Sequence, residues 1–295
     1  MNIVVASICK NEEDMIRPWL ETLLSLEQIV DIHIFDTGST DATLDYIKAY
    51  KDSRIKLFEM KDFKNFSAAR NYILKTVEYG DWIWQPDIDE IPSANYKDLF
   101  DHLLTKDFSG CNYIYLPHIK MFDFDKIWFH TPPVAPYINR ERITYSWEKD
   151  TTTLFRRDSI GTYSGDLHER ISYLHGKGCR VPFSYDVDMS DLPDEVFMIH
   201  YSKAKLNAEA RRTGKSFEYC VGKKRMVYRR IQPVTYFGKL FDAAWCDKAT
   251  EEDIEELGRL QMKQFIEVEG HVFPEMPFDV RKLNNSFVKK YHENA

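Results

Sequence analysis

The first third of the chain alternates between two hydrophobic patterns, short apolar runs and apolar residues at helical spacing. The runs of strand length are residues 3–8 (IVVASI), 29–35 (IVDIHIF), 55–59 (IKLFE) and 81–85 (DWIWQ). The stretches with helical spacing between them are residues 16–24, 42–50 and 67–77. Strands that alternate with helices predict an α/β fold with a mostly parallel sheet, whose ligands lie beyond the carboxyl ends of the strands.

Acidic residues stand at two of these strand ends. Asp36 follows the second strand, and Gly38 permits a tight turn after it. Asp87 and Asp89 follow the fourth strand, and residues i and i+2 of an extended chain point to the same side. Both can therefore project into one crevice, where a divalent cation is the simplest partner for two close carboxylates. An isolated Asp-x-Asp is more often an ordinary polar turn, so the surrounding motifs must decide.

Two common nucleotide signatures are missing from the sequence. No Gly-x-Gly-x-x-Gly follows the first strand, and no complete Gly-x-x-x-x-Gly-Lys-Ser/Thr occurs. Dehydrogenase and P-loop NTPase classes are therefore disfavoured. A cleft that holds acids instead of a glycine-lined phosphate cradle suits a diphosphate bridged by a metal ion.

The rest of the chain is less regular. Residues 151–155 and 196–199 are strand-like, and the second run ends in His200. Residues 163–169 (YSGDLHE) form a glycine-hinged segment that is rich in ionisable groups. Residues 250–267 have the acidic first turn and the apolar spacing of a helix.

Four motifs together carry a resemblance to a known family. They are SICKNEE (residues 7–13), IFDTGSTDAT (34–43), NFSAARNYIL (65–74) and GDWIWQPDIDEI (80–91). In this order and spacing, residues 1–92 resemble the N-terminal half of a family 2 glycosyltransferase, close to the lipopolysaccharide core β-glucosyltransferase-like branch. The resemblance implies a GT-A (Rossmann-like) fold, with a mostly parallel central sheet flanked by helices.

The resemblance also implies a nucleotide site and a metal site. The nucleotide site would contain Ser7, Cys9, Glu12, Asp36, Ser39, Arg70, Asp87 and Ile88. Ser7, Glu12 and Asp36 would line the nucleobase pocket. Arg70 would approach the nucleotide or the diphosphate, and Asp87 would face the ribose. For Glu12 and Arg70, respectively, the alternatives are an ordinary acid in a first helical turn and an ion pair on a helix surface.

The metal, Mn²⁺ or Mg²⁺, would be bound by Asp89 together with His200, which stands where the family has a late histidine. A histidine at a strand end is otherwise an ordinary polar residue. The family more often has Asp-Ala-Asp, so the bulkier Ile88 is a departure that would alter how the ribose sits. Asp87 and Asp89 nevertheless remain two positions apart, so both side chains can still point to the same side.

Transfer with inversion needs a base for the acceptor hydroxyl. The segment around residues 156–169 resembles the family's Phe-Arg-Arg followed by Gly-x-x-His-Glu, which makes Glu169 the predicted base and Asp166 the reserve. His168 would contact the acceptor, the diphosphate or the metal. The alternative is that Glu169 closes a capping turn. Trp128 and Trp147 are acceptor candidates because aromatic faces stack on sugars, although aromatic side chains are more often core.

Charge is distributed unevenly along the chain, which has a net charge of −7. This sign disfavours nucleic acid as a partner. Residues 203–230 contain ten Lys and Arg against Glu209 and Glu218, or +8, which leaves −15 for the rest. Much of this stretch is predicted to be helical, with weak points at Gly214 and Gly222. It would bind the diphosphate or an anionic acceptor, contact an acidic membrane surface, or face an acidic neighbour within the fold.

The composition places the chain among globular proteins. With 43% hydrophobic residues, 295 residues can form a sizeable core. No apolar run is long enough to span a membrane and no basic, apolar leader precedes the first strand, so the expected location is cytoplasmic, with peripheral membrane contact through residues 203–230. The five cysteines are widely spaced and odd in number, so we expect them to be reduced.

These observations predict a GT-A catalytic domain over residues 1–203, with a nucleotide-binding half (1–92) and an acceptor and catalytic half (93–203). A helical C-terminal extension would follow over residues 204–295. The predicted reaction is metal-dependent transfer of a sugar from a nucleoside diphosphate sugar, with UDP favoured, to a hydroxyl of a carbohydrate, glycan or glycolipid. The alternatives are a nucleotidyltransferase and a non-catalytic module that binds nucleotide or sugar.

Overall fold

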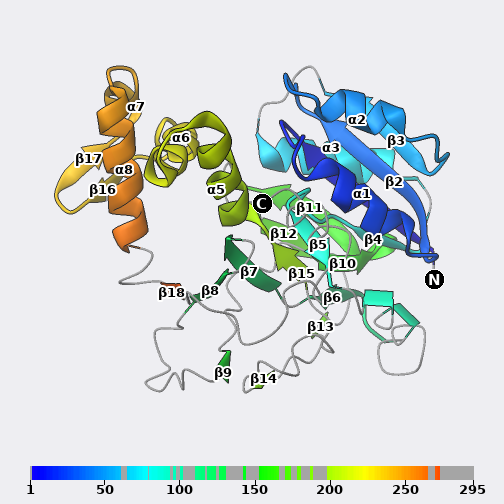
Figure 1. The fold of residues 1–295 in the computed structure, drawn as a ribbon. Coiled ribbons are helices and arrows are strands. Elements are labelled where there is room, and N and C mark those ends of the chain that lie inside the picture. Colours follow the sequence, from blue (N-terminus) through cyan, green and yellow to red (C-terminus); the bar gives the residue numbers. More distant parts are fainter. Residues whose placement is uncertain are drawn as a thin grey trace. The chain divides into compact units, whose positions relative to one another are not determined.

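The computed structural model consists of two compact units (Figure 1). Unit 1 comprises Met1–Ile119, Trp147–His200 and Pro277–Ala295, and unit 2 comprises Lys120–Ser146 and Tyr201–Met276. The structure describes residues 2–60, 65–78, 80–93, 96–97, 100–101, 110–116, 118–123, 126–130, 142–143, 153–165, 170–173, 178–180, 187–188, 198–264 and 270–272.

Unit 1 begins with the predicted alternation of strands and helices. Its first elements are β1 (Ile3–Cys9), α1 (Ile16–Leu24), β2 (Ile29–Asp36), α2 (Thr43–Ala49), β3 (Ile55–Glu59), α3 (Phe66–Thr76), β4 (Trp82–Trp84) and β5 (Glu90–Pro92). Each predicted element up to β4 differs from the observed one by at most one residue at either end. The hydrophobic periods therefore located these elements correctly.

Later segments of unit 1 add further strands and one 3-10 turn. They are β6 (Tyr113–Tyr115), the start of β7 (His118–Asp123), β10 (Thr153–Arg156), η1 (Arg157–Ser159), β11 (Ile160–Ser164), β12 (Arg170–Tyr173), β13 (Gly178–Arg180), β14 (Val187–Asp188) and β15 (Met198–His200). The strand-like runs at 151–155 and 196–199 correspond to β10 and β15. β15 pairs antiparallel with β5, and β11 pairs antiparallel with β12.

A seven-stranded sheet in the order β13-β6-β10-β4-β1-β2-β3 forms the centre of unit 1. β4, β1, β2 and β3 are parallel to one another, whereas β10 is antiparallel to both β4 and β6. Figure 1 shows β2 and β3 side by side, with α1 and α2 beside them. The predicted α/β class with a mostly parallel sheet is confirmed.

The core of unit 1 follows from the alternation of side chains along the strands. Val4 and Ala6 of β1 are fully buried and belong to one cluster with Ile73 and Val77, which come from α3 and its C-terminal end. α1 contributes a separate buried stripe at Ile16, Trp19, Leu20 and Leu23. Asp36 stands at the carboxyl end of β2, where the next loop begins.

Unit 2 is mainly helical in the part that the structure describes, as predicted for the C-terminal extension. Its elements are the end of β7, β8 (Lys126–His130), β9 (Arg142–Ile143), α5 (Ser202–Thr213), α6 (Phe217–Arg229), β16 (Val234–Tyr236), β17 (Lys239–Phe241), α7 (Ala243–Cys246), α8 (Glu251–Gln264) and β18 (Gly270–Val272). The predicted helix at 250–267 corresponds to α8. None of the described helices has the length and apolar character that a membrane span requires.

The two glycines of the basic stretch behave differently. Gly214 ends α5 with a left-handed backbone, φ 65°, so it is a true break between helices. Gly222 lies inside α6, where it packs against the backbone of α8, so it is not a weak point. Gly214 also starts the only Gly-Lys-Ser of the chain, but Ser216 caps α6 and Lys215 pairs with Glu251 at 2.7 Å. This tripeptide connects two helices, whereas a phosphate-binding loop follows a strand.

The expectation that all cysteines are reduced is wrong. Cys111 forms a disulfide, whereas Cys9, Cys220 and Cys246 are free and buried. An odd count and wide spacing argue against a framework of several disulfides, but they do not exclude one bond between residues that the fold brings together.

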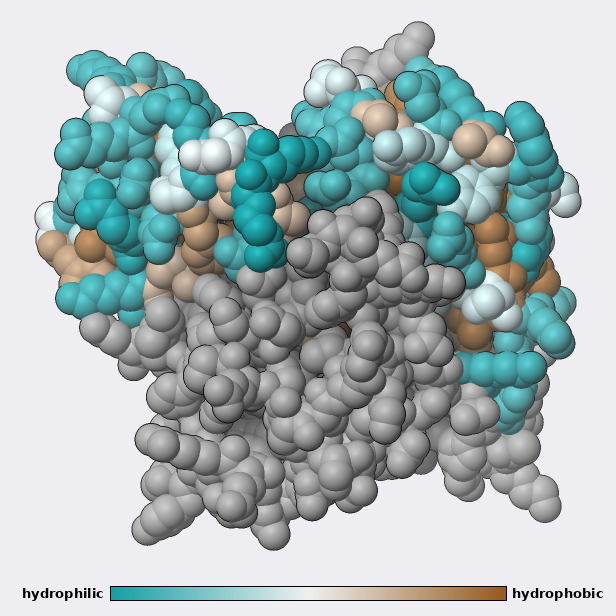
Figure 2. All heavy atoms as spheres, in the orientation of Figure 1, coloured by the Kyte–Doolittle hydropathy of each residue, from teal (hydrophilic) through white to brown (hydrophobic). Residues whose placement is uncertain are grey.

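Most of the described surface is hydrophilic in the view of Figure 2, with only small apolar areas. The large hydrophobic side chains that are most exposed are Tyr72, Val227, Ile231, Phe237 and Leu240. Some cations of the basic stretch are paired within unit 2, including Lys223 with Glu209 at 3.6 Å and Arg230 with Asp247 at 2.5 Å. These pairs follow the expectation of acidic neighbours within the fold.

Candidate functional site

The loops after β1 and β2 interlock at the carboxyl edge of the sheet. Asp36, which is 3% exposed, accepts hydrogen bonds from the backbone N–H groups of Gly38 (2.9 Å) and Ser39 (3.0 Å) and from the Ser39 hydroxyl. Asn11 has φ 55°, and its Oδ1 accepts from the backbone of Thr40 at 2.8 Å. The Ser39 hydroxyl in turn accepts from the Asn11 N–H at 2.9 Å. Asp36 therefore fixes the turn that carries Ser39.

The predicted nucleotide-site residues of β1 and of the loop after it lie next to this junction. Ser7 is fully buried, and its hydroxyl has no hydrogen-bond partner among the described residues. The carbonyl of Cys9 accepts from the Thr37 N–H at 2.9 Å. Glu12 precedes α1 and donates its backbone N–H to Thr43 Oγ1 at 2.7 Å, so it does not belong to the first turn of that helix.

Arg70 lies inside unit 1, not on a helix surface. It belongs to α3, which Asn65 caps by accepting from the Ala68 N–H at 2.8 Å. The residue is 4% exposed, donates from Nη2 to Asp87 Oδ1 at 2.9 Å, and lies over the ring of Tyr163 at 5.8 Å from its centroid. The Asp87 side chain is 45% exposed. Arg70 therefore orients an acid that remains accessible.

A turn presents the acids that follow β4. The Glu90 N–H donates to the Asp87 carbonyl at 3.0 Å, and the Glu90 carboxylate accepts from the Asp87 N–H at 3.0 Å. Ile88 is 2% exposed and packs into the core of the unit, whereas Asp89 turns toward His200. The turn thus separates the buried side chain of Ile88 from the carboxylates of Asp87 and Asp89.

Asp89 and His200 lie close together and could hold a metal ion. The distance between Asp89 Oδ1 and His200 Nε2 is 3.6 Å. This is too long for a hydrogen bond, but both atoms can bind one cation at about 2.1 Å each. A carboxylate with an imidazole suits Mn²⁺ better than Mg²⁺. The chemistry and the spacing of these donors therefore fit a divalent cation.

Two residues without a predicted role lie behind this pair. Glu90 Oε1 is 3.6 Å from His118 Nδ1, and Glu90, His118 and His200 offer ligand atoms within 4.8 Å of one another. Burial raises the pKa of the neighbouring Tyr96 phenol well above its usual value, and the charge of Glu90 adds to this effect. Glu90 could have been selected from the sequence, because it follows the Asp-x-Asp motif directly. No sequence signal pointed to His118, because it comes from a distant segment.

The predicted catalytic segment follows a strand that α3 holds in place. Asn71 donates to the Tyr163 carbonyl at 2.8 Å and accepts from its N–H at 2.7 Å, and the Ser67 hydroxyl donates to the Gly165 carbonyl. The predicted residues Asp166, His168, Glu169 and Trp147 lie outside the described residues. Trp128 is in β8, where only the backbone is described.

Comparison with known proteins identifies the family. The profile of glycosyl transferase family 2 matches residues 4–160, which is more than half of the 295-residue chain. The chain belongs to this family. No curated protein shows significant similarity to it.

Solved structures show a more distant likeness. Staphylococcus aureus TarS (residues 1–349, in complex with UDP) is 17% identical with a TM-score of 0.38, over 53% of this chain and 47% of TarS. Glucosyl-3-phosphoglycerate synthase from Mycobacterium tuberculosis (with Mn²⁺, UDP and glucosyl-3-phosphoglycerate) is 19% identical with a TM-score of 0.33, over 40% and 44% of the two chains. The present chain therefore spans less than half the length of either structure.

Proposed function

We propose that the protein transfers a sugar from a nucleoside diphosphate sugar to an acceptor hydroxyl, with inversion and with a divalent cation. Membership of glycosyl transferase family 2 supports the reaction class. The observation that supports the metal dependence is the 3.6 Å distance between Asp89 Oδ1, in the turn after β4, and His200 Nε2, at the end of β15.

Each part of the site has a task in this reaction. Ser7 of β1, Glu12 of the following loop and Asp36 at the end of β2 bind the nucleoside, and Asp87, held by Arg70, contacts the ribose. Asp89 and His200 hold the cation, which when bound offsets the charge of the departing diphosphate. Glu169 takes the proton of the acceptor hydroxyl as the hydroxyl oxygen bonds to the anomeric carbon and the bond from that carbon to the diphosphate breaks.

The donor and the acceptor are narrower proposals. UDP is the expected nucleotide, as the resemblance to the β-glucosyltransferase-like branch suggests, and the sugar is a hexose. The acceptor is a carbohydrate, glycan or glycolipid. The cations of residues 203–230 would contact an anionic acceptor or an acidic membrane surface.

A donor panel separates this function from the alternatives. We expect the protein with Mn²⁺ to release nucleoside diphosphate slowly from a UDP-sugar. Pyrophosphate release would instead indicate a nucleotidyltransferase, and nucleotide binding without turnover would indicate a binding module. The loop after β1 begins with Lys10, Asn11, Glu12 and Glu13, and it contains no glycine and more acids than bases, which argues against the nucleotidyltransferase.

The substitution Asp89→Ala tests the metal site directly. Turnover and Mn²⁺-dependent UDP binding should both disappear, because the remaining imidazole cannot hold the cation alone. Asp158→Ala is the matched control, since Asp158 is exposed and lies at η1. Unchanged Mn²⁺-dependent binding in Asp89→Ala, measured by calorimetry, would contradict the proposed site.

A further inference from the structure

We infer that Glu90 is a positioning residue of the metal site, which fixes both the turn that carries Asp89 and the imidazole of His200. The buried side chain of His118 lies beside the Glu90 carboxylate. This inference rests on the proposed function, because it concerns the same cation. It assigns a role to two buried groups that the reaction itself does not use.

The first observation is strand register. β5 and β15 are antiparallel, and Glu90 pairs directly with His200. Side chains of directly opposed residues project from the same face of a sheet, with Cβ atoms about 5 Å apart. The sheet therefore places the Glu90 carboxylate beside the His200 ring before any metal is bound.

The second observation is that the two oxygens of Glu90 face different groups. Oε2 accepts the Asp87 N–H at 3.0 Å, which closes the turn from Asp87 to Glu90. Oε1 is 3.6 Å from His118 Nδ1. One carboxylate thus connects the turn that presents Asp89 to the histidines behind it.

The third observation is burial. Glu90 is 1% exposed and His118 7%. A carboxylate in such a place is costly unless polar partners compensate it, so Glu90 and its partners should behave as one unit. Substitution of Glu90 should consequently affect the positions of Asp89 and His200 more than the exposed residues around them.

The orientation of His200 indicates what this unit does. Its Nε2 faces Asp89, and a histidine that binds a metal commonly donates its other ring N–H to a carboxylate. That hydrogen bond sets the tautomer and the ring angle and raises the basicity of the ligand nitrogen. Glu90 is the carboxylate on the same face of the β5–β15 pair, so His200 Nδ1 is the atom through which it would act.

The test compares Mn²⁺ binding, with and without UDP, in the wild-type chain, Glu90→Gln and His118→Gln by calorimetry. We expect Glu90→Gln to weaken Mn²⁺ about 10- to 100-fold and to reduce the metal-dependent part of UDP binding. His118→Gln should have a smaller effect in the same direction. UDP binding in EDTA should not change in either variant, because the loops after β1 and β2 are intact and the amide oxygen in Glu90→Gln can still accept the Asp87 N–H.

Glu59→Gln is the matched control, because it makes the same chemical change at the exposed end of β3. If Mn²⁺ affinity is the same in Glu90→Gln as in the wild type, the inference is wrong and the proposed function stands. If the wild-type chain itself shows no Mn²⁺-dependent UDP binding, both are wrong. An equal loss of UDP binding in EDTA would indicate a general structural defect and would also overturn the inference.

A crystal structure of the wild-type chain with Mn²⁺ and UDP decides the matter if Glu90→Gln does not fold. We expect a Glu90 oxygen within hydrogen-bond distance of His200 Nδ1 and outside the coordination sphere. A Glu90 oxygen at about 2.2 Å from the ion would make Glu90 a ligand and overturn the positioning role. A His200 ring that makes no contact with Glu90 would do the same.

Discussion

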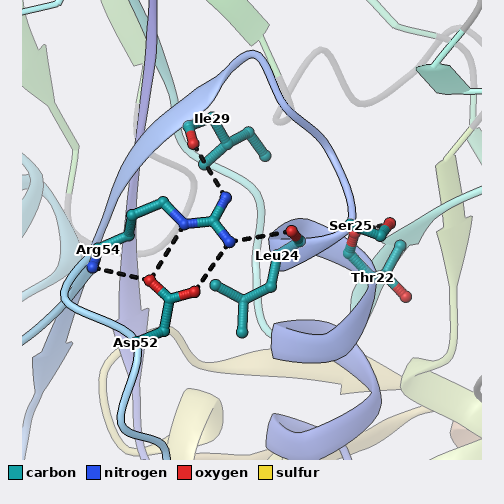
Figure 3. A network of polar contacts seen from close by, with 6 residues as sticks. All are labelled: Thr22, Leu24, Ser25, Ile29, Asp52 and Arg54. Carbon is teal, nitrogen blue, oxygen red and sulfur yellow. Dashed lines mark hydrogen bonds and ion pairs between the residues drawn. The ribbon is translucent and has the colours of Figure 1, made fainter.

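Arg54 shows how a single side chain can join three elements of unit 1 (Figure 3). Its guanidinium donates to both carboxylate oxygens of Asp52, at 3.1 and 2.9 Å, and to the carbonyls of Leu24 (3.0 Å) and Ile29 (3.3 Å). Leu24 ends α1, where backbone carbonyls lack helical partners and cations are favoured. Arg54 therefore connects the end of α1 to the starts of β2 and β3.

Asp52→Asn should lower stability in a pH-dependent way. The hydrogen bonds from Arg54 hold the pKa of Asp52 below its usual value. A depressed folded-state pKa gives a stabilisation that is complete above the unfolded pKa and is lost as the pH falls through the folded value. For a partly exposed pair we expect about 0.5–1 kcal/mol at pH 7, fading below about pH 4.

Urea unfolding of wild type and Asp52→Asn across pH 3–7 measures this difference. Glu27→Gln is the control, since Glu27 is exposed. A difference that grows toward acid pH would contradict the assigned partner.

Glu169→Gln tests the proposed catalytic base. Removal of a general base typically lowers the rate about 10²- to 10⁴-fold. We expect turnover to fall by this amount while calorimetry shows unchanged binding of UDP and Mn²⁺. Asp166→Asn, at the reserve position, should retain most of the activity. If Glu169→Gln transfers sugar at the parental rate, the base is another residue.

At the level of elements, glycine allows α6 and α8 to approach unusually closely. A Cβ on Gly222 would lie 1.8 Å from the carbonyl oxygen of Ile254, and one on Gly258 would lie 1.8 Å from that of Glu218. Neither oxygen can move without shifting a helix backbone. The contact also explains why Gly222 is retained inside α6, where glycine by itself weakens a helix.

Gly222→Ala and Gly258→Ala should therefore destabilise unit 2. Alanine gains about 1 kcal/mol in helix propensity, but the overpacking against backbone costs more, and we expect a net loss of about 1–3 kcal/mol. Chemical denaturation followed by circular dichroism measures the change. Gly110→Ala is the control because a Cβ there meets no atom within 4 Å. Equal stability of all three variants would show that the helices separate easily.

For the whole molecule, the proposed site predicts that UDP and Mn²⁺ stabilise the fold together. A ligand at about 100 times its Kd adds about 2.7 kcal/mol to the free energy of unfolding. We expect the melting temperature to rise most with UDP plus Mn²⁺, to fall back to the value for UDP alone when EDTA is added, and to show no Mn²⁺-dependent rise in Asp89→Ala. An equal rise with UDP alone would indicate that the cation adds nothing to nucleotide binding.

Local chemistry explains how much of unit 1 could be predicted. β1 and β2 are buried along most of their length, so their limits are sharp, whereas the edge strand β3 is only half-buried. Asp36, Arg70, Asp87 and Asp89 could be selected because they stand in motifs of fixed spacing. Their mutual arrangement was less accessible, since the burial of Arg70 against Asp87 and Tyr163 depends on segments far apart in the chain.

The sequence by itself determined the elements of the nucleotide-binding half, the parallel character of the sheet and the acids at its edge, because each depends on neighbouring residues. Only the tertiary structure decided that Glu90 and His118 lie behind Asp89 and His200, that Cys111 forms a disulfide, and that Gly222 is a contact instead of a break. Each of these depends on pairing between distant segments. Pairing of that kind is selected by the packing of the whole fold and leaves no periodic signal in the chain.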